Sequence, residues 1–235
     1  MTDEQNPLVR AEITDGIGEL VIDRPERRNA LTSDTISELH AGLDRLIADD
    51  AVRVILIRGE GGAFCAGNDL KEPRADDHGD RWRRLHAAMH ASSKPTVGAL
   101  ERFAIAGGSA LALACDFLVA GETAYIHTSE VKMGMSAPIN AVWLELKHSL
   151  ATAYRFAVAG MRIPGPELVE LGVAVRAVPD ADVLTEARTF ASRLAENDPA
   201  AVAKVRATLL ALRGLEGARA FEERVLAAQR AAAAV

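Results

Sequence analysis

A few side chains in this sequence stand at spacings that are familiar from enzyme sites. His86 and His90 lie four residues apart on an expected helix, the spacing of two ligands of one metal ion. No glutamate follows His86 and no third ligand is evident, so we expect no metal site. Ser109 lacks the second glycine of a nucleophile elbow, and helix packing explains it better than serine hydrolysis does. Cys65 adjoins a glycine-bearing loop, where a small buried thiol is a better interpretation than a reactive one.

Two glycine-bearing segments can bring the main chain close to a ligand. The first contains Gly61, Gly62 and Gly67, and the second begins a helix of small residues with Gly107 and Gly108. Glycine adopts backbone conformations that are closed to other residues. The unpaired N–H groups at the start of a helix, together with the helix dipole, favour an anion. Taken alone, each segment is explained better by a turn or by close helix packing.

The elements that must position these segments alternate along the first half of the chain. Apolar runs predict strands at residues 8–13, 18–22, 52–57, 95–100 and 116–120, and helices after residue 32, around residue 82 and over 109–114. Asp15-Gly16 predicts a β-hairpin turn between the first two strands. Strands that alternate with helices indicate parallel β-α units, in which ligands bind at the carboxyl ends of the strands. Both glycine-bearing segments follow such ends.

The length and composition favour one main core with a small appendage. The chain has 235 residues, of which 49% are hydrophobic. We expect a core of residues 1–180, with a short strand at 173–178, and a C-terminal helical oligomerisation region of residues 181–235. Three amphipathic helices are predicted in the last part, at 182–194, 199–212 and 215–232.

Charge and cysteine content restrict the class of partner and the compartment. The formal net charge of −6, from 33 acidic and 27 basic residues, argues against nucleic acid or an anionic membrane surface as partner. The polar N-terminus has no signal-peptide pattern, and the apolar stretch 104–120 is interrupted by Ser109 and Asp116. Cys65 and Cys115 lack paired spacing, which favours free thiols in a reducing compartment. We therefore expect a cytoplasmic protein.

Three motifs, in this order and at this spacing, resemble the landmarks of the crotonase (enoyl-CoA hydratase/isomerase) superfamily. They are RPERRNALT at 24–32, GGAFCAGNDLKE at 61–72 and IAGGSALALACD at 105–116, and the resemblance extends from about residue 8 to residue 180. It implies an α/β fold, a crotonase-like spiral of β-β-α units with a C-terminal helical appendage. It also implies an enzyme that acts on an acyl-CoA thioester, with coenzyme A as part of the substrate and no separate cofactor. A homotrimer or a dimer of trimers, with the C-terminal helices at the subunit contacts, is a further expectation from this resemblance.

The chemistry of this family develops negative charge on the thioester oxygen. The resemblance assigns the stabilisation of that charge to the backbone N–H groups of Ala66 and Gly107, and losing one such donor costs roughly 3–4 kcal/mol. It places Glu130 at one family carboxylate and Ala110 where the other glutamate normally stands. A single carboxylate can take a proton from one carbon and return it to another. The resemblance therefore favours double-bond isomerisation over hydration.

Coenzyme A has phosphate groups that need local cations on an acidic protein. The substrate-binding residues that the resemblance implies are Arg24, Arg28, Ala30, Asp69, Leu70 and Lys71, with Arg27 in the same cluster. The arginines and Lys71 would meet the nucleotide end, and the first glycine-bearing segment would line the pantetheine path. For Asp69, accepting backbone N–H groups of its own loop is a better interpretation than catalysis.

The sequence also departs from the family pattern. Glu101-Arg102 stands where asparagine-glycine is common, and residues 136–139 replace the proline-glycine and further glycines that usually follow the catalytic glutamate. The acyl pocket must therefore be reshaped, and Glu101 and Glu145 become reserve acid–base candidates, although ion-pair or surface roles suit them better. Because Ala110 is not a carboxylate, two alternatives stay open: an acyl-CoA binder with little or no turnover, and another crotonase-type lyase or hydrolase.

Overall fold

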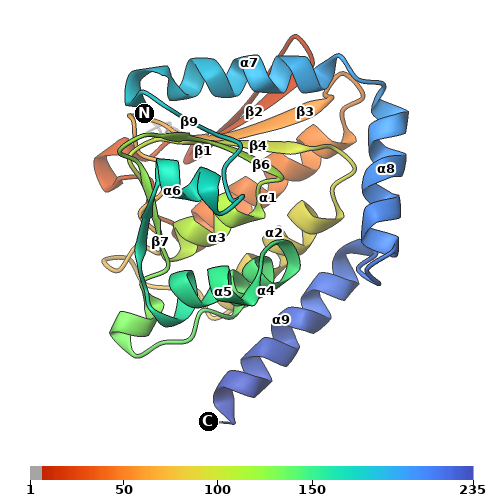
Figure 1. Cartoon of the computed structure of the whole chain (residues 1–235). Coiled ribbons are helices and arrows are strands. Elements are labelled where there is room, and N and C mark those ends of the chain that lie inside the picture. Colours follow the sequence, from red (N-terminus) through yellow and green to blue (C-terminus); the bar gives the residue numbers. More distant parts are fainter. Residues whose placement is uncertain (1–6, 235) are drawn as a thin grey trace, which may run out of the picture.

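A computed structural model describes residues 7–234, so the N-terminus from which the absence of a signal peptide was predicted lies outside the described residues. Among the described residues, six strands form the main sheet in the order β1-β2-β3-β4-β6-β9 (Figure 1). Their bounds are Val9–Thr14 (β1), Ile17–Ile22 (β2), Val54–Gly59 (β3), Thr96–Leu100 (β4), Phe117–Gly121 (β6) and Arg176–Val178 (β9). From β2 to β9 every neighbouring pair is parallel, as the alternation of strands and helices predicts.

The N-terminal hairpin forms as its turn residues predict. β1 and β2 are antiparallel, and Asp15 and Gly16 between them both have positive φ angles. That backbone conformation suits the right-handed twist of a hairpin. β2 then runs parallel to β3, so the hairpin forms one edge of the sheet.

Helices cover both faces of the main sheet (Figure 1). On one face lie α1 (Ser33–Ala48), α2 (His78–Ala91) and α3 (Gly107–Ala114), and on the other lies α7 (Val183–Ala195). β3 shows the reason: Ile55 and Ile57 belong to the core beneath α1, whereas Val54 and Leu56 pack with α7. Side chains alternate between the faces of a strand, so a continuous apolar run predicts a strand that is covered on both sides.

A second, smaller sheet was not predicted from the sequence. Its strands are β5 (Phe103–Ile105), β7 (Tyr125–His127) and β8 (Arg162–Pro164). Strands of three residues are too short to show a periodic pattern, so sequence reasoning missed all three. Their position matters for function, because β5 ends just before Gly107 and β7 ends just before Glu130.

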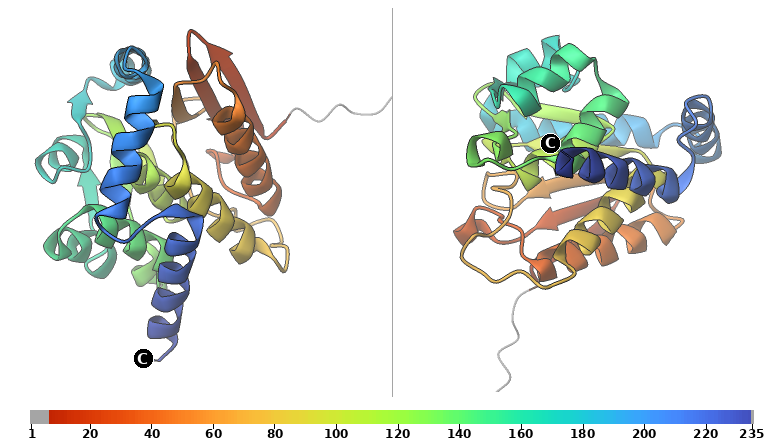
Figure 2. Two further views of the ribbon diagram at one scale, coloured as in Figure 1. Left: turned by 90° about the vertical axis from the view of Figure 1, so that its right-hand side faces the viewer. Right: turned by 90° about the horizontal axis from the view of Figure 1, so that it is seen from below.

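The C-terminal part is helical and is packed to different degrees. Its other elements are η2 (Glu130–Met133), α4 (Pro138–Lys147), α5 (Leu150–Ala153), η3 (Tyr154–Val158), α6 (Gly165–Glu170), η4 (Asp180–Asp182), α8 (Pro199–Ala211) and α9 (Gly217–Ala233), and η1 (Pro25–Arg27) lies near the N-terminus. α7 belongs to the sheet core, and α9 packs on α2 and α4 through Phe221 and Val225. α8 buries none of its residues and lies along the outside of the molecule (Figure 2). The oligomerisation role of 181–235 stays a prediction.

None of the helices in residues 7–234 is long and apolar enough to cross a bilayer.

Candidate active site

The two glycine-bearing segments lie against each other at the carboxyl ends of the central strands. The N–H of Ile105 donates to the carbonyl of Cys65 at 3.0 Å, which joins the segments directly. A Cβ atom on Gly67 would lie 3.3 Å from the Gly107 nitrogen, and one on Gly108 would lie 2.3 Å from the Cys65 oxygen. Glycine at these positions therefore permits an approach that a larger residue would prevent. The convergence of the two segments that the motifs imply is present in the structure.

Gly107 begins α3, and the turn before it is strained. Ala106, the residue before the helix, has φ 49° and ψ −115°, which is an unusual conformation for a residue with a side chain. Its N–H donates to the carbonyl of His127 at 2.9 Å, so the small sheet holds the turn in place. Within the described residues no acceptor meets the N–H of Gly107. This N–H is therefore available to a ligand, as expected for the first turn of a helix.

Ala66 is not available in the way that the sequence resemblance implied. Its N–H donates to the carbonyl of Arg28 at 3.1 Å, so the fold already uses this donor. The N–H of Asn68, by contrast, meets no acceptor in residues 7–234. The reason is the isolated parallel bridge between Leu31 and Asn68. In such a bridge the flanking groups pair with Leu31, and the N–H of Asn68 itself points away from it.

Asn68 also lies beside the second segment. Its Oδ1 would be 3.6 Å from a Cβ atom placed on Gly107. The same oxygen is 3.3 Å from Nε2 of His78, whose Nδ1 is 2.9 Å from Oγ of Ser33. Burial, together with the charges of nearby arginines, lowers the pKa of His78, so its ring is neutral at pH 7. Sequence reasoning missed both Asn68 and His78, because only the tertiary structure brings them to the glycine-bearing segments.

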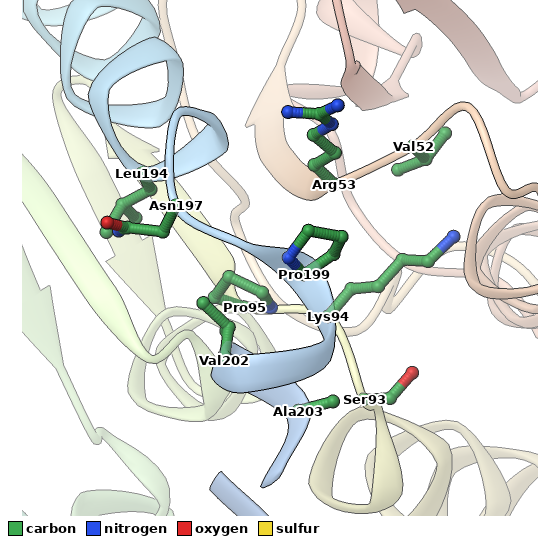
Figure 3. A pocket seen from close by; sticks show the side chains of 10 residues that line it. All are labelled: Val52, Arg53, Ser93, Lys94, Pro95, Leu194, Asn197, Pro199, Val202 and Ala203. Carbon is green, nitrogen blue, oxygen red and sulfur yellow. The ribbon is translucent and has the colours of Figure 1, made fainter. Parts of the chain in front are cut away.

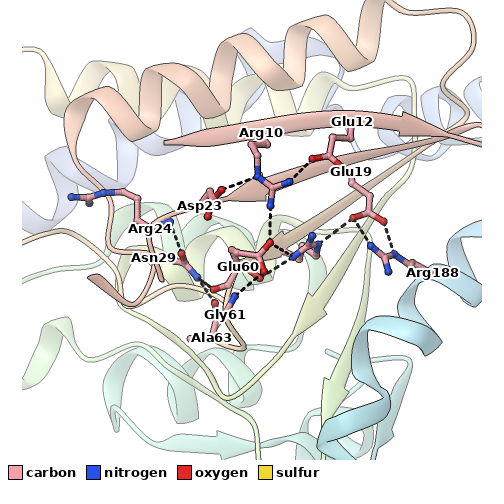
Figure 4. A network of polar contacts seen from close by, with 12 residues as sticks. Arg10, Glu12, Glu19, Asp23, Arg24, Asn29, Glu60, Gly61, Ala63 and Arg188 are labelled. Atoms are coloured by element: carbon pink, nitrogen blue, oxygen red, sulfur yellow. Dashed lines mark hydrogen bonds and ion pairs between the residues drawn. The ribbon is translucent and has the colours of Figure 1, made fainter. Parts of the chain in front are cut away.

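The RPERRNALT motif holds the first segment in place. Asn29 is fully buried, has a φ of 56°, and its Nδ2 donates to the carbonyls of Glu60 (2.9 Å) and Ala63 (2.6 Å). Its Oδ1 accepts from the N–H of Arg24 at 3.0 Å. Figure 4 shows the contacts of Asn29 next to an ion-pair network in which Arg10, Glu19 and other side chains connect the hairpin to α7. The motif therefore fixes the loop rather than providing a reactive group.

Arg24 is committed to the protein. Its side chain is 7% exposed, and it donates to the carbonyl of Ala30, to Glu72 at 2.8 Å and to Asp69 at 3.4 Å. Its charge is thus compensated by two carboxylates, so Arg24 holds the loop where the resemblance implied a phosphate contact. Arg28 and Lys71 are exposed and have no ion pair among the described residues.

Asp69 ties down its own loop, as the sequence analysis favoured. Its Oδ1 accepts from the N–H of Lys71 at 3.0 Å, and Arg27 donates to both of its oxygens. Burial would raise the pKa of Asp69, but the Lys71 N–H and the guanidinium groups of Arg27 and Arg24 outweigh it and hold the pKa below 3.8. Asp69 is therefore a charged structural residue. Leu70, next in the chain, is 79% exposed.

Glu130 has a different environment. It lies three residues after the end of β7, and its Oε1 accepts from Nδ2 of Asn140 at 3.1 Å. Its Oε2 is buried and has no partner within residues 7–234. Burial raises the pKa of Glu130 above 4.5, and the backbone N–H groups of Glu130 and Ser129 offset this only in part. Nδ2 of Asn140 also lies 3.5 Å from the carbonyl of Ala106, so one amide connects Glu130 to the residue before Gly107.

The other candidate carboxylates are less suitable. Ala110, where the family has a glutamate, is 1% exposed and packs in the core. Glu145 is exposed and paired with Arg224 at 2.8 Å. Burial raises the pKa of Glu101, and the charges that act on it are those of Arg58 on β3 and of Glu60 directly after β3. Glu130 is thus the predicted carboxylate that the structure links to the Gly107 turn.

The residues that the sequence analysis treated as structural have structural contacts. Nδ1 of His86 accepts from Trp143 at 2.9 Å, and burial lowers the pKa of His86 to about 3. His90 bonds the carbonyl of Leu215 at 2.8 Å. Burial raises the pKa of the Cys65 thiol to about 12, which makes it unreactive at neutral pH. Ser109 bonds neighbouring side chains inside the protein.

A separate cavity of about 80 Å³ lies at the opposite ends of the strands (Figure 3). Its lining includes Arg53 before β3, Pro95 before β4, and Val202 on α8. None of the predicted site residues lines it. Because parallel sheets bind ligands at the carboxyl ends of their strands, the glycine-bearing segments remain the candidate site.

Comparisons with known proteins show the family and the fold of this chain. The sequence matches the family described as "Enoyl-CoA hydratase/isomerase" over residues 12–231. A Thermus thermophilus protein named "Putative enoyl-CoA hydratase" is 36% identical over 200 residues, which are 81% of this chain and 79% of the relative. A solved enoyl-CoA hydratase from Mycobacterium smegmatis has a TM-score of 0.80 at 28% identity and covers 98% of this chain and 100% of its own. Another, from Mycobacterium avium subsp. paratuberculosis, has a TM-score of 0.84 at 24% identity, with 94% and 92% covered. This chain therefore belongs to the enoyl-CoA hydratase/isomerase family and has the crotonase fold.

Proposed function

We propose that the protein is an enoyl-CoA isomerase that moves a double bond of an acyl-CoA thioester, with Glu130 as its one catalytic carboxylate. The observation that supports this most is the state of Glu130: one oxygen accepts from Asn140, and the other is buried and has no partner in the part of the chain that the structure describes. The position of the missing glutamate is occupied by Ala110 within the apolar core. Water that adds to a double bond needs a second group to orient it, and no second carboxylate adjoins Glu130 among the described contacts.

The thioester oxygen is held by two backbone donors. We assign them to the N–H groups of Gly107 and Asn68, because neither meets an acceptor within residues 7–234, whereas the N–H of Ala66 donates to Arg28. The N–H of Gly107 has the additional field of a helix start. Preorganised donors of this kind stabilise charge as it develops on the oxygen, by roughly 3–4 kcal/mol each.

The proton moves on a single carboxylate. Glu130 removes a proton from C2 of a 3-enoyl-CoA. The electrons of the C2–H bond delocalise over the resulting dienolate, which extends from C4 to the thioester oxygen and places negative charge on that oxygen. The same carboxyl group returns the proton to C4, which leaves a 2-enoyl-CoA and the original carboxylate. Burial raises the pKa of Glu130 toward pH 7. A pKa nearer the working pH suits a group that must both accept a proton and donate it. No atom is gained or lost, and no separate cofactor is required.

Coenzyme A is bound along the first segment. Lys71 and Arg28 are the exposed cations there without an ion pair in the described residues, so we assign them to the phosphates. The exposed Leu70 is placed to contact the pantetheine. The homotrimer or dimer of trimers implied by the family resemblance remains part of the proposal.

The test is a product analysis with defined substrates. The purified protein is incubated with a 3-enoyl-CoA and separately with a 2-enoyl-CoA, and the thioesters are separated by chromatography. We expect interconversion of the two isomers and little 3-hydroxyacyl-CoA. In Glu130→Gln, both the interconversion and any formation of 3-hydroxyacyl-CoA should be lost. Hydration as fast as isomerisation would overturn the proposal. Binding of coenzyme A without conversion of any enoyl-CoA would favour an acyl-CoA binder instead.

A further inference from the structure

We propose that Asn140 is a positioning residue that clamps Glu130 to the start of α3 and dictates which of its two oxygens transfers the proton. This inference rests on the proposed function in that it assigns catalysis to Glu130. The observation behind it is a continuous series of hydrogen bonds from the buried side chains of Thr128, Ser109 and Asn140 to the half-buried Glu130. Sequence reasoning did not single out Asn140.

The geometry determines the orientation of the amide. Asn140 is 3% exposed, and its Oδ1 accepts from Oγ of Ser109 at 2.7 Å. Its Nδ2 faces two acceptors, Oε1 of Glu130 at 3.1 Å and the carbonyl of Ala106 at 3.5 Å. An amide nitrogen has two hydrogens for two acceptors, whereas a reversed amide would set an oxygen against both of them. The amide therefore faces Glu130 with its donors.

The other end of the amide is held by helix α3. Oγ of Ser109 lies 3.1 Å from Oγ1 of Thr128 and 2.7 Å from the carbonyl of Ala106. Ser109 and Thr128 are fully buried. Since Ser109 is two residues after Gly107, a shift of Asn140 relative to the helix would break bonds on both sides. The clamp thus sets the position of Glu130 relative to the N–H of Gly107.

The amide nitrogen Nδ2 can donate but cannot accept a hydrogen bond, and this decides which oxygen of Glu130 holds the proton. Because Nδ2 donates to Oε1 of Glu130, that oxygen stays an acceptor both in the carboxylate and in the carboxylic acid. The proton must then be on Oε2 when Glu130 is protonated. Oε2 is the oxygen that is buried without a partner, so it is the one left for a substrate carbon.

The clamp lies where this sequence departs from its family. Asn140 follows residues 136–139 directly, which replace the proline-glycine and further glycines that are usual there. Pro138 begins α4, and Asn140 is in the first turn of that helix. A glycine has no side chain and cannot hold a carboxylate. The contact to Glu130 therefore comes from the residue that directly follows the altered segment.

No charged group takes the place of this contact. The titratable and charged side chains on the surrounding elements are His127 on β7, Lys132 on η2, Tyr154 and Arg155 on η3, and Glu145 and Lys147 on α4. None of them forms an ion pair with Glu130 in the described part of the chain. A hydrogen bond to a carboxylate favours its charged form, so the donor Nδ2 counters the burial of Glu130.

The experiment measures the pKa of Glu130 directly. Protein with ¹³C-labelled glutamate carboxyl groups is titrated by NMR, with Glu130→Gln to assign the resonance. Asn140→Leu removes the donor at similar volume, and we expect the pKa of Glu130 to rise by about one pH unit, the lower end of what a hydrogen bond to a charged group provides. Asn140→Asp, close in size, should raise it further through a shared proton, and serves as the deciding variant if Asn140→Leu does not fold. Asn197→Leu, at an exposed position, is the matched control and should change nothing.

Kinetics provide the second readout. Glu130 must be ionised to accept a proton. A higher pKa of Glu130 therefore moves the acid limb of the pH profile of kcat/KM to higher pH. At pH 7 we expect kcat to fall about 10-fold in Asn140→Leu, with little change in KM. An unchanged pKa and an unmoved limb in both variants would overturn the inference. The titration needs no substrate, so it still tests the clamp if the wild-type protein converts no enoyl-CoA, a result that would overturn the proposed function alone.

Discussion

Two carboxylates at the candidate site, the buried Asp69 and the half-buried Glu130, have opposite environments. Asp69 is surrounded by donors that are positively charged or fixed: Arg27, Arg24 and the N–H of Lys71. Its pKa is lowered despite its burial. Glu130 has no charged donor within residues 7–234: its one side-chain donor is the neutral amide of Asn140, its Oε2 has no partner there, and burial raises its pKa. The acidities of these two carboxylates are thus separated by their partners.

The difference separates structural from reactive groups. A carboxylate with a lowered pKa and several donors holds its loop but is a poor base, because its proton affinity is low. A carboxylate with a raised pKa and a free oxygen has higher proton affinity and an oxygen that can receive a proton. Cations differ in the same way: Arg24 is used internally, whereas Lys71 is exposed. The motif residues nearest the glycine-bearing segments are therefore mainly structural, whereas Glu130, which lies outside the three motifs, has the properties of a reactive group.

The comparison is tested most strongly by Glu130→Gln. We expect the isomerase kcat to fall about 10³-fold, since general acid–base groups contribute 10²–10⁴-fold. Stability should stay the same or increase, because the variant removes a buried charge without an ion pair. Conversion of 3-enoyl-CoA and urea unfolding measure the two effects. Glu145→Gln, which alters an exposed ion pair, should keep activity within about twofold. Full activity in Glu130→Gln would abolish the distinction.

Asp69→Asn should show the reverse pattern. Removing the charge leaves Arg27 without its carboxylate and Arg24 with Glu72 alone. We expect a loss of about 3 kcal/mol in the free energy of unfolding, the low end for a buried pair because Arg27 is 30% exposed. Urea denaturation measures it. Remaining folded protein should keep its kcat within a few-fold, as Asp69 does not touch the reacting atoms. A large fall in kcat without loss of stability would place Asp69 with the catalytic groups.

The pH dependence of stability should differ in sign between the two carboxylates. The pKa of Asp69 in the folded state is below its ordinary 3.8, so its contribution to stability is present above pH 4 and disappears as pH falls through the folded pKa. For Glu130 the folded pKa lies above 4.5, so ionisation costs stability, and that cost is complete only above the folded pKa. The stability difference from wild type should thus decrease toward pH 3 for Asp69→Asn. For Glu130→Gln, any gain should be larger at pH 8 than at pH 4.

The smallest expected effect concerns Lys71. Lys71→Ala should weaken coenzyme A binding about fivefold, because an exposed pairing with phosphate is worth about 1 kcal/mol, and the difference should shrink at high salt. Isothermal titration at two ionic strengths measures it. Lys204→Ala, at another exposed lysine on α8, is the control and should leave affinity unchanged. An unaltered affinity in Lys71→Ala would remove this residue from the binding site.

Much of the fold could be predicted because the patterns are long. The hairpin, the strands of the main sheet and the amphipathic helices appeared close to their predicted bounds, since burial on one or two faces leaves a periodic trace in sequence. The small sheet of β5, β7 and β8 left no such trace. Yet this sheet sets the direction of the Gly107 turn and of Glu130. The least predictable element is thus the one closest to the candidate site.

By itself the sequence determined the family, the general site and the identity of Glu130 and Gly107 as candidates, because glycine-bearing segments and their order depend on local backbone requirements. Only the tertiary structure decided which groups remain free. It shows that Arg28 uses the N–H of Ala66, that Asn68 keeps a free one, and that Asn140 holds Glu130. The physical reason is that a hydrogen bond between distant segments leaves no mark in either of them, so the availability of a donor or a proton acceptor is a property of the folded chain.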